Sequence, residues 1–174
     1  MDLFEREDLQ RLIRLLAVQL DSRGVTGTVS IVGGAALSIQ YLVDRDSTTD
    51  IDALLPQNPQ VTEVINEIAL QENLPTNWIN DAVKAYVPFE TQSMWVELFT
   101  VGGITIRVAT ADLLLAMKLK ADRGMRDRPD IEGLIRLSGH KEFSQIRDVY
   151  EKFHHQEVMA ERTSRLVQGI LASF

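Results

Sequence analysis

The chain contains no cysteine among its 174 residues. This absence excludes disulfides, thiolate nucleophiles and cysteine-ligated zinc together. The chain also lacks an apolar run of the roughly 18 residues that a membrane-spanning helix needs, and its first residues lack the basic and long apolar segments of an export signal. We therefore expect a cytoplasmic protein with no membrane partner.

Basic residues are also scarce. Lysine and arginine total 18 against 25 aspartates and glutamates, which gives a net charge of -7. A surface of this charge repels nucleic acid unless cations gather locally. The hydrophobic content of 45% suits a buried core. The chain therefore has the composition of a globular protein, and its function must be sought in local clusters.

Helix and strand signals alternate along the first two thirds of the chain. Periodicity predicts helices over 9–20, 35–42, 61–70, 111–121 and 129–137, strands over 28–32, 49–55, 94–100 and 104–109, and two more helices after Glu142. The last two strands are joined as a hairpin, and residues 75–87 show no clear period. We predict an α+β fold with a small mixed sheet, in which residues 1–139 form the core and residues 140–174 pack on it as C-terminal helices.

Two aspartates flank an isoleucine in the second predicted strand. Residues two apart in a strand face the same side, so Asp50 and Asp52 would hold parallel carboxylates while Ile51 enters the core. Such a pair can bind Mg²⁺ when a nucleotide brings the remaining oxygen ligands. Taken alone, however, this pattern is more typical of a solvated strand face.

A glycine pair lies where the first strand gives way to a helix. Gly33 and Gly34 would allow close backbone approach, and the helix N-terminus would favour an anion. A tight turn is the ordinary explanation of such a pair. The combination with the two aspartates is stronger than either motif, because together they predict a metal on one side and phosphates on the other.

A second cluster of charge lies further along the chain. From Lys118 to Arg128 the sequence contains five lysines and arginines and two aspartates. This segment therefore has a net charge of +3 in an acidic protein. Lysine and arginine suit phosphate oxygens. A solvated helix end, with Asp127 and Asp130 capping the next helix, explains the cluster about equally well. Asp127 would either contact an acceptor or metal, or hold Arg126 or Lys118 in place.

The order strand, Gly-Gly, helix, loop and Asp-Ile-Asp resembles the nucleotidyltransferase fold of the DNA polymerase beta-like superfamily. The helical Lys118 followed by Arg126, Asp127 and Asp130 is similar to bacterial proteins of the AbiEii and MenT toxin type. These motifs span residues 29–137. The resemblance implies two Mg²⁺ ions, a nucleoside triphosphate bound by the glycines, Lys118, Arg126 and Asp127, and a third carboxylate on a later strand.

Glu97 is the candidate for this third carboxylate and metal ligand. We expect its strand to lie beside that of Asp50 and to present Glu97 to the same face. The family usually has an aspartate here. Asp81 is the rival, and its more ordinary role is to cap a short helix.

The sequence therefore predicts Mg²⁺-dependent transfer of a nucleotidyl group from a nucleoside triphosphate to a hydroxyl. The catalytic residues would be Asp50, Asp52, Glu97 and Lys118. By resemblance, the acceptor would be an RNA end or a protein side chain, with a cognate antitoxin as a partner, while a small-molecule acceptor is equally open. The alternative is an inactive nucleotide-binding or regulatory module of the same fold.

Overall fold

The computed structural model of the chain describes residues 3–42, 45, 47–85, 87, 92–121, 123–155 and 157–174. The chain divides into two compact units. The first comprises Met1–Ala85 and Thr91–Ala109, and the second comprises Tyr86–Glu90 and Thr110–Phe174. The domain boundary that the sequence places after residue 139 stays a prediction.

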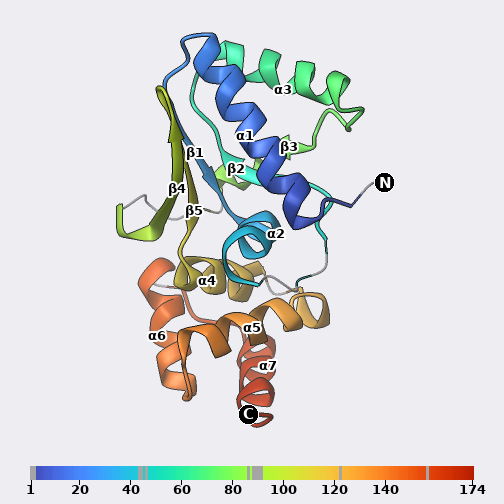
Figure 1. Cartoon of the computed structure of the whole chain (residues 1–174). Helices are drawn as coiled ribbons and strands as arrows, with labels where there is room; N and C mark the ends of the chain where they lie inside the picture. The colour runs from blue at the N-terminus through green and yellow to red at the C-terminus, as the bar shows by residue number, and fades with distance from the viewer. Residues whose placement is uncertain are drawn as a thin grey trace. The chain divides into compact units, whose positions relative to one another are not determined.

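The first unit is built on a five-stranded mixed sheet (Figure 1). The strands are β1 (Gly27–Ile31), β2 (Ile51–Leu54), β3 (Ile79–Asn80), β4 (Trp95–Val101) and β5 (Ile104–Ala109), in the order β3-β2-β1-β5-β4. Strand β1 pairs antiparallel with β2 and parallel with β5, while β4 and β5 form an antiparallel hairpin. The predicted mixed sheet and hairpin are confirmed.

Helices cover one face of this sheet. The helical segments of the first unit are α1 (Arg6–Ser22), α2 (Gly33–Ala36), the π-helix η1 (Leu37–Tyr41), α3 (Pro59–Gln71) and the 3₁₀ turns η2 (Ala82–Ala85) and η3 (Gln92–Met94). Helix α1 contacts α3, β4 and β5 (Figure 1). The side chains of Val29, Ile31, Ile51, Ala53, Ile106 and Val108 alternate along three strands and are fully buried. The opposite face of the sheet is left for polar residues.

Two elements differ from the prediction. The segment 75–87 contains the two-residue strand β3, which is too short to show a period and forms by parallel pairing with β2. The helix expected from Ala35 begins at Gly33 and continues as a π-helix after Ala36. Both differences lie around the aspartate pair, so they affect the geometry of the candidate site.

The second unit is helical. It contains α4 (Ala111–Ala121), the 3₁₀ turn η4 (Gly124–Arg126), α5 (Arg128–Ser138), α6 (Phe143–Phe153) and α7 (Glu161–Leu171). Helix α4 packs against α5 and α6, and α6 packs against α7. The α+β class with a helical C-terminal part is therefore confirmed. In the described ranges, no helix has both the length and the apolar character needed to cross a bilayer.

Candidate functional site

Asp52 lies in strand β2, and Asp50 immediately precedes that strand. Ile51 is fully buried, whereas Asp50 and Asp52 are half-buried on the other face, as strand alternation requires. The backbone N–H of Val32 donates to the carbonyl of Asp52 at 2.9 Å. This bond fixes Asp52 beside the residue that precedes Gly33, so the aspartates and the glycine turn meet at one end of the sheet.

The two glycines of the turn leave room for neighbouring side chains to approach the backbone closely. Gly33 has a φ of +63°, and a Cβ added there would lie 2.9 Å from Oδ2 of Asp52. A Cβ on Gly34 would lie 3.0 Å both from a guanidinium nitrogen of Arg45 and from Oγ1 of Thr48. The absent side chains therefore let a carboxylate approach one glycine and a cation approach the next.

Asn80 on β3 completes the surroundings of the aspartates. It lies beside Asp52 in the β2–β3 pairing, and its Nδ2 donates to Oδ2 of Asp50 at 3.3 Å. Thr49 donates to the other carboxylate oxygen of Asp50 at 3.2 Å. The group that neighbours the aspartate pair is thus an amide. Sequence reasoning missed Asn80 because its strand has only two residues.

Glu97 is further from the pair than expected. The expectation that its strand lies beside β2 is wrong, because β1 and β5 separate β2 from β4. Three strand spacings amount to about 14 Å. Glu97 of β4 pairs with Arg107 of β5, and Arg107 pairs with Ser30 of β1. Glu97 therefore lies on the same face of the sheet as Arg107 and Ser30, which we call the polar face. Its exposed carboxylate accepts a hydrogen bond from Thr100 at 3.1 Å.

The rival candidate, Asp81, immediately precedes η2 and forms an ion pair with Lys84. Both side chains are about half exposed. Its position matches the ordinary role expected of a residue at the start of a short helical turn. The catalytic roles considered for Asp81 and Glu97 stay predictions.

Arg107 is a cation on the polar face that sequence reasoning did not select. Its Nε donates to Oγ of Ser30 at 2.7 Å, and its guanidinium lies 4.5 Å from the centre of the Trp95 ring. The available signal was a single charged residue within an otherwise uncharged strand. Arg107 therefore adds positive charge to the face that carries the aspartates.

The donor atoms around the aspartates suit magnesium. Within the part of the chain that the structure describes, no three His, Cys, Asp or Glu residues cluster closely enough to hold a metal ion. The chain offers instead the carboxylates of Asp50 and Asp52, while the amide of Asn80 donates its Nδ2 to Asp50 and its Oδ1 accepts from the N–H of Ala82. An all-oxygen set with few protein ligands fits Mg²⁺ when a nucleotide supplies further oxygens.

Lys118, in the second unit, is buried between carboxylates. It is 6% exposed, and its Nζ lies 2.7 Å from Oδ1 of Asp127 and 2.8 Å from Oδ2 of Asp130. Arg123 binds both oxygens of Asp127 at 2.8 and 2.9 Å. Of the alternatives left by the sequence, Asp127 does hold Lys118, together with Arg123. Two cations and two carboxylates thus join the end of α4 to the start of α5.

The same contacts set the protonation of Asp127. Burial alone would raise its pKa, but the hydrogen bonds and charges of Arg123 and Lys118 outweigh burial and hold the pKa below its usual value. Arg126 is exposed in η4. The expected contacts of Lys118, Arg126 and Asp127 with a nucleotide stay predictions.

Gly33→Ala tests the close approach of Asp52. An alanine at a φ of +63° is strained, and its Cβ would press on the carboxylate. We expect the free energy of unfolding, measured by urea denaturation, to fall by at least about 2 kcal/mol. Gly24→Ala is the matched control, because Gly24 has a φ of +70° with no atom within 4 Å of an added Cβ. It should cost only about 1 kcal/mol, and an equal loss in the two variants would contradict the contact.

Asp127→Asn tests the buried ion pairs. We expect it to lower the free energy of unfolding by about 3 to 5 kcal/mol at neutral pH. Because the folded pKa lies below the reference value of 3.8, the stabilisation by Asp127 is present above that value and is lost as the pH falls through the folded pKa. Denaturation curves at several pH values measure both effects.

The control for this variant is Glu132→Gln, which removes the exposed pair with Arg136 on the same helix. It should change stability by less than about 0.5 kcal/mol. If Asp127→Asn had an equally small effect, the buried pairs would not stabilise the second unit.

Comparison with protein families gives one match that spans most of the chain. Residues 7–157 match a family described as "Nucleotidyltransferase of unknown function (DUF6036)". Neither the curated proteins nor the solved structures gave a significant match. The family match includes both the glycine turn with its aspartates and the Lys118 cluster. The chain therefore belongs to this nucleotidyltransferase family.

Proposed function

We propose that the chain is a Mg²⁺-dependent enzyme that transfers a nucleotidyl group from a nucleoside triphosphate to a hydroxyl. The observation that carries this proposal is the placement of Asp50 just before β2 and Asp52 within it, with Oδ2 of Asp52 2.9 Å from where a Cβ on Gly33 would lie. Family membership supports the class of reaction. The metal, the nucleotide and the acceptor are our own inference from the residues and from the families that their motifs resemble.

The glycine turn is the proposed place of the phosphates. The first N–H groups of a helix have no acceptor within the helix and carry partial positive charge. Gly33 and Gly34 begin α2, which continues directly into η1. The guanidinium of Arg45 lies against Gly34 and provides donors that suit phosphate oxygens. A triphosphate bound here would have its phosphates beside the carboxylate of Asp52.

The two aspartates would then hold Mg²⁺ and orient the reacting groups. Thr49 and Asn80 fix the carboxylate of Asp50 by donating to both of its oxygens. The ion would neutralise the triphosphate and lower the pKa of the attacking hydroxyl. In the reaction, the hydroxyl would lose its proton to water, its oxygen would bond to the α-phosphorus, the bond from the α-phosphorus to the oxygen bridging to the β-phosphate would break, and pyrophosphate would leave. Glu97 is not given a role in this scheme because two strands separate it from β2.

The acceptor and partners belong to the same proposal. As in the AbiEii and MenT toxin type that the motifs resemble, an RNA end or a protein side chain would accept the nucleotidyl group, and an antitoxin would bind the chain. The net charge of -7 disfavours extended contact with RNA. A protein, a small molecule or only the end of an RNA therefore fits better than a long nucleic acid.

One observation favours the alternative of a nucleotide-binding module without turnover. The residue nearest the aspartate pair on the adjoining strand is Asn80, where a third carboxylate would help coordinate the catalytic metal. An amide gives a weaker ligand with no charge. The two functions differ in whether pyrophosphate is released.

A measurement of pyrophosphate release distinguishes the enzyme from the nucleotide-binding module. The chain is incubated with each nucleoside triphosphate and Mg²⁺, in the presence of total RNA or protein from the native host, and pyrophosphate is measured by a coupled assay. We expect release that stops when Mg²⁺ is removed and that falls at least about a hundredfold in Asp50→Asn and in Asp52→Asn. The control is Asp81→Asn, which removes a nearby carboxylate that pairs with Lys84, and it should retain at least about half of the rate.

Triphosphate binding without pyrophosphate release, unaltered by Asp50→Ala, would contradict the enzyme and support the binding module. An equal loss of rate in Asp81→Asn and Asp52→Asn would contradict the assignment of the metal ligands. Thermal unfolding of each variant shows whether a lost rate reflects a lost fold.

A further inference from the structure

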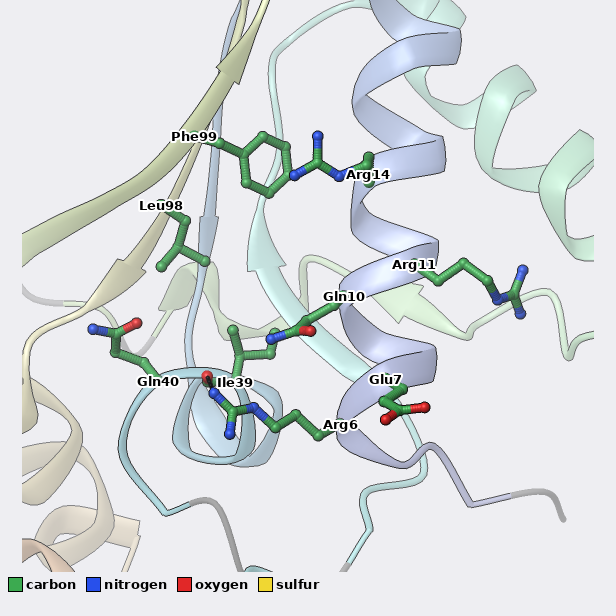
Figure 2. Close-up of a pocket in the computed structure, with 9 residues that line it drawn as sticks. All are labelled: Arg6, Glu7, Gln10, Arg11, Arg14, Ile39, Gln40, Leu98 and Phe99. Atoms are coloured by element: carbon green, nitrogen blue, oxygen red, sulfur yellow. Dashed lines mark hydrogen bonds between the residues drawn. The ribbon is translucent and has the colours of Figure 1, made fainter.

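A groove lies between α1, η1 and the edge strand β4 of the first unit (Figure 2). Its volume is about 520 Å³, within the range of pockets that bind small organic ligands. None of its lining residues belongs to the aspartate pair or the glycine turn. The proposed transfer reaction therefore leaves this groove without a role.

One stripe of α1 supplies the polar wall of the groove. Arg6, Gln10 and Arg14 are spaced four residues apart and so lie on the same side of the helix. Figure 2 shows these three side chains directed toward β4 and η1, while Arg11 and Glu7 lie at the border of the groove. Arg11 pairs with Glu72 at 2.6 Å. Three arginines of α1 therefore line the groove, and Arg11 differs from Arg6 and Arg14 in being paired with a carboxylate.

The other two arginines of the groove are not neutralised. Among the residues that the structure describes, neither Arg6 nor Arg14 has a carboxylate within ion-pair distance. One terminal nitrogen of Arg6 donates to the carbonyl of Ile39 at 3.1 Å, and its Nε is buried with no partner. Uncompensated cations on a protein of net charge -7 attract an anion, and phosphate is a suitable acceptor for guanidinium groups.

Strand β4 forms the apolar wall of the groove, opposite α1, with the side chains of Leu98 and Phe99. The guanidinium of Arg14 lies 4.6 Å from the centre of the Phe99 ring. Phe99 and a stacked guanidinium form a platform of the kind on which unpaired bases stack. Gln10 and Gln40 add amides that both donate and accept hydrogen bonds, as the edge of a base requires. The groove therefore combines a phosphate partner, a stacking surface and edge contacts.

We propose that this groove binds one nucleotide unit, either a free nucleoside monophosphate or the terminal nucleotide of a single-stranded RNA. The phosphate contacts Arg6 and Arg14, and the base lies against Arg14 and Phe99. A site of this size holds one nucleotide and needs no extended basic surface, which is consistent with the acidic charge of the chain. The site requires no metal and does not depend on the proposed transfer reaction.

Calorimetric titration tests this site in the intact chain. The probes are AMP, inorganic phosphate and single-stranded penta-adenylate, each added at about 0.1 M salt with EDTA present, so that a metal-dependent site makes no contribution. We expect saturable binding of AMP or penta-adenylate that weakens at least about tenfold in Arg14→Gln and several-fold in Phe99→Leu. Equal affinity for AMP and penta-adenylate identifies a free nucleotide as the ligand, and much tighter binding of penta-adenylate identifies a strand end.

Arg11→Gln is the matched control, because it removes an arginine of the same helix at the border of the groove whose charge is already paired with Glu72. It should change the affinity less than about twofold. Gln10→Ala provides a second variant if Arg14→Gln lowers the unfolding temperature. The proposal is overturned if neither nucleotide probe binds saturably, if inorganic phosphate binds as tightly as AMP, or if Arg11→Gln weakens binding as much as Arg14→Gln.

Discussion

The hydrogen bond between the N–H of Val32 and the carbonyl of Asp52 is the constraint on which the candidate site depends. It aligns β2 with the end of β1 and places the carboxylate of Asp52 against Gly33, where only a hydrogen atom fits. A slip of one residue would exchange the positions of Asp52 and Ile51. It would bury a charge and expose an apolar side chain, both at a cost in free energy. The buried face of β2 therefore stabilises the register that brings the aspartates to the glycines.

The chain uses its cations in two different ways. Lys118 is neutralised by Asp127 and Asp130, and breaking such buried pairs costs about 3 to 5 kcal/mol, a large part of the total stability of a domain. A loss of activity in a Lys118 variant would therefore reflect a loss of folding stability and not the loss of a catalytic group. Arg14, by contrast, lies against the Phe99 ring and forms no ion pair with any residue that the structure describes. Its charge stabilises little in the free protein and is available to a ligand.

Much of the fold could be predicted from the sequence because most elements are long enough to show a period. The same reasoning placed Asp50 and Asp52 on one face, since strand alternation is a local property. The order of strands is not local, so the parallel pairing of β1 with β5, which carries Glu97 away from β2, could not be predicted. Asn80 was missed because a two-residue strand leaves no pattern. Charge spacing suggested a contact between Lys118 and Asp127 but not its burial.

The central claim is that Asp50 and Asp52 hold the metal of a nucleotide site. It is tested most directly by a crystal structure with Mn²⁺ and a non-hydrolysable nucleoside triphosphate, in which anomalous scattering locates the metal. The account predicts a peak bound by both carboxylates, with the phosphates at Gly33 and Gly34. A bound triphosphate whose metal lies away from Asp50 and Asp52 would contradict it.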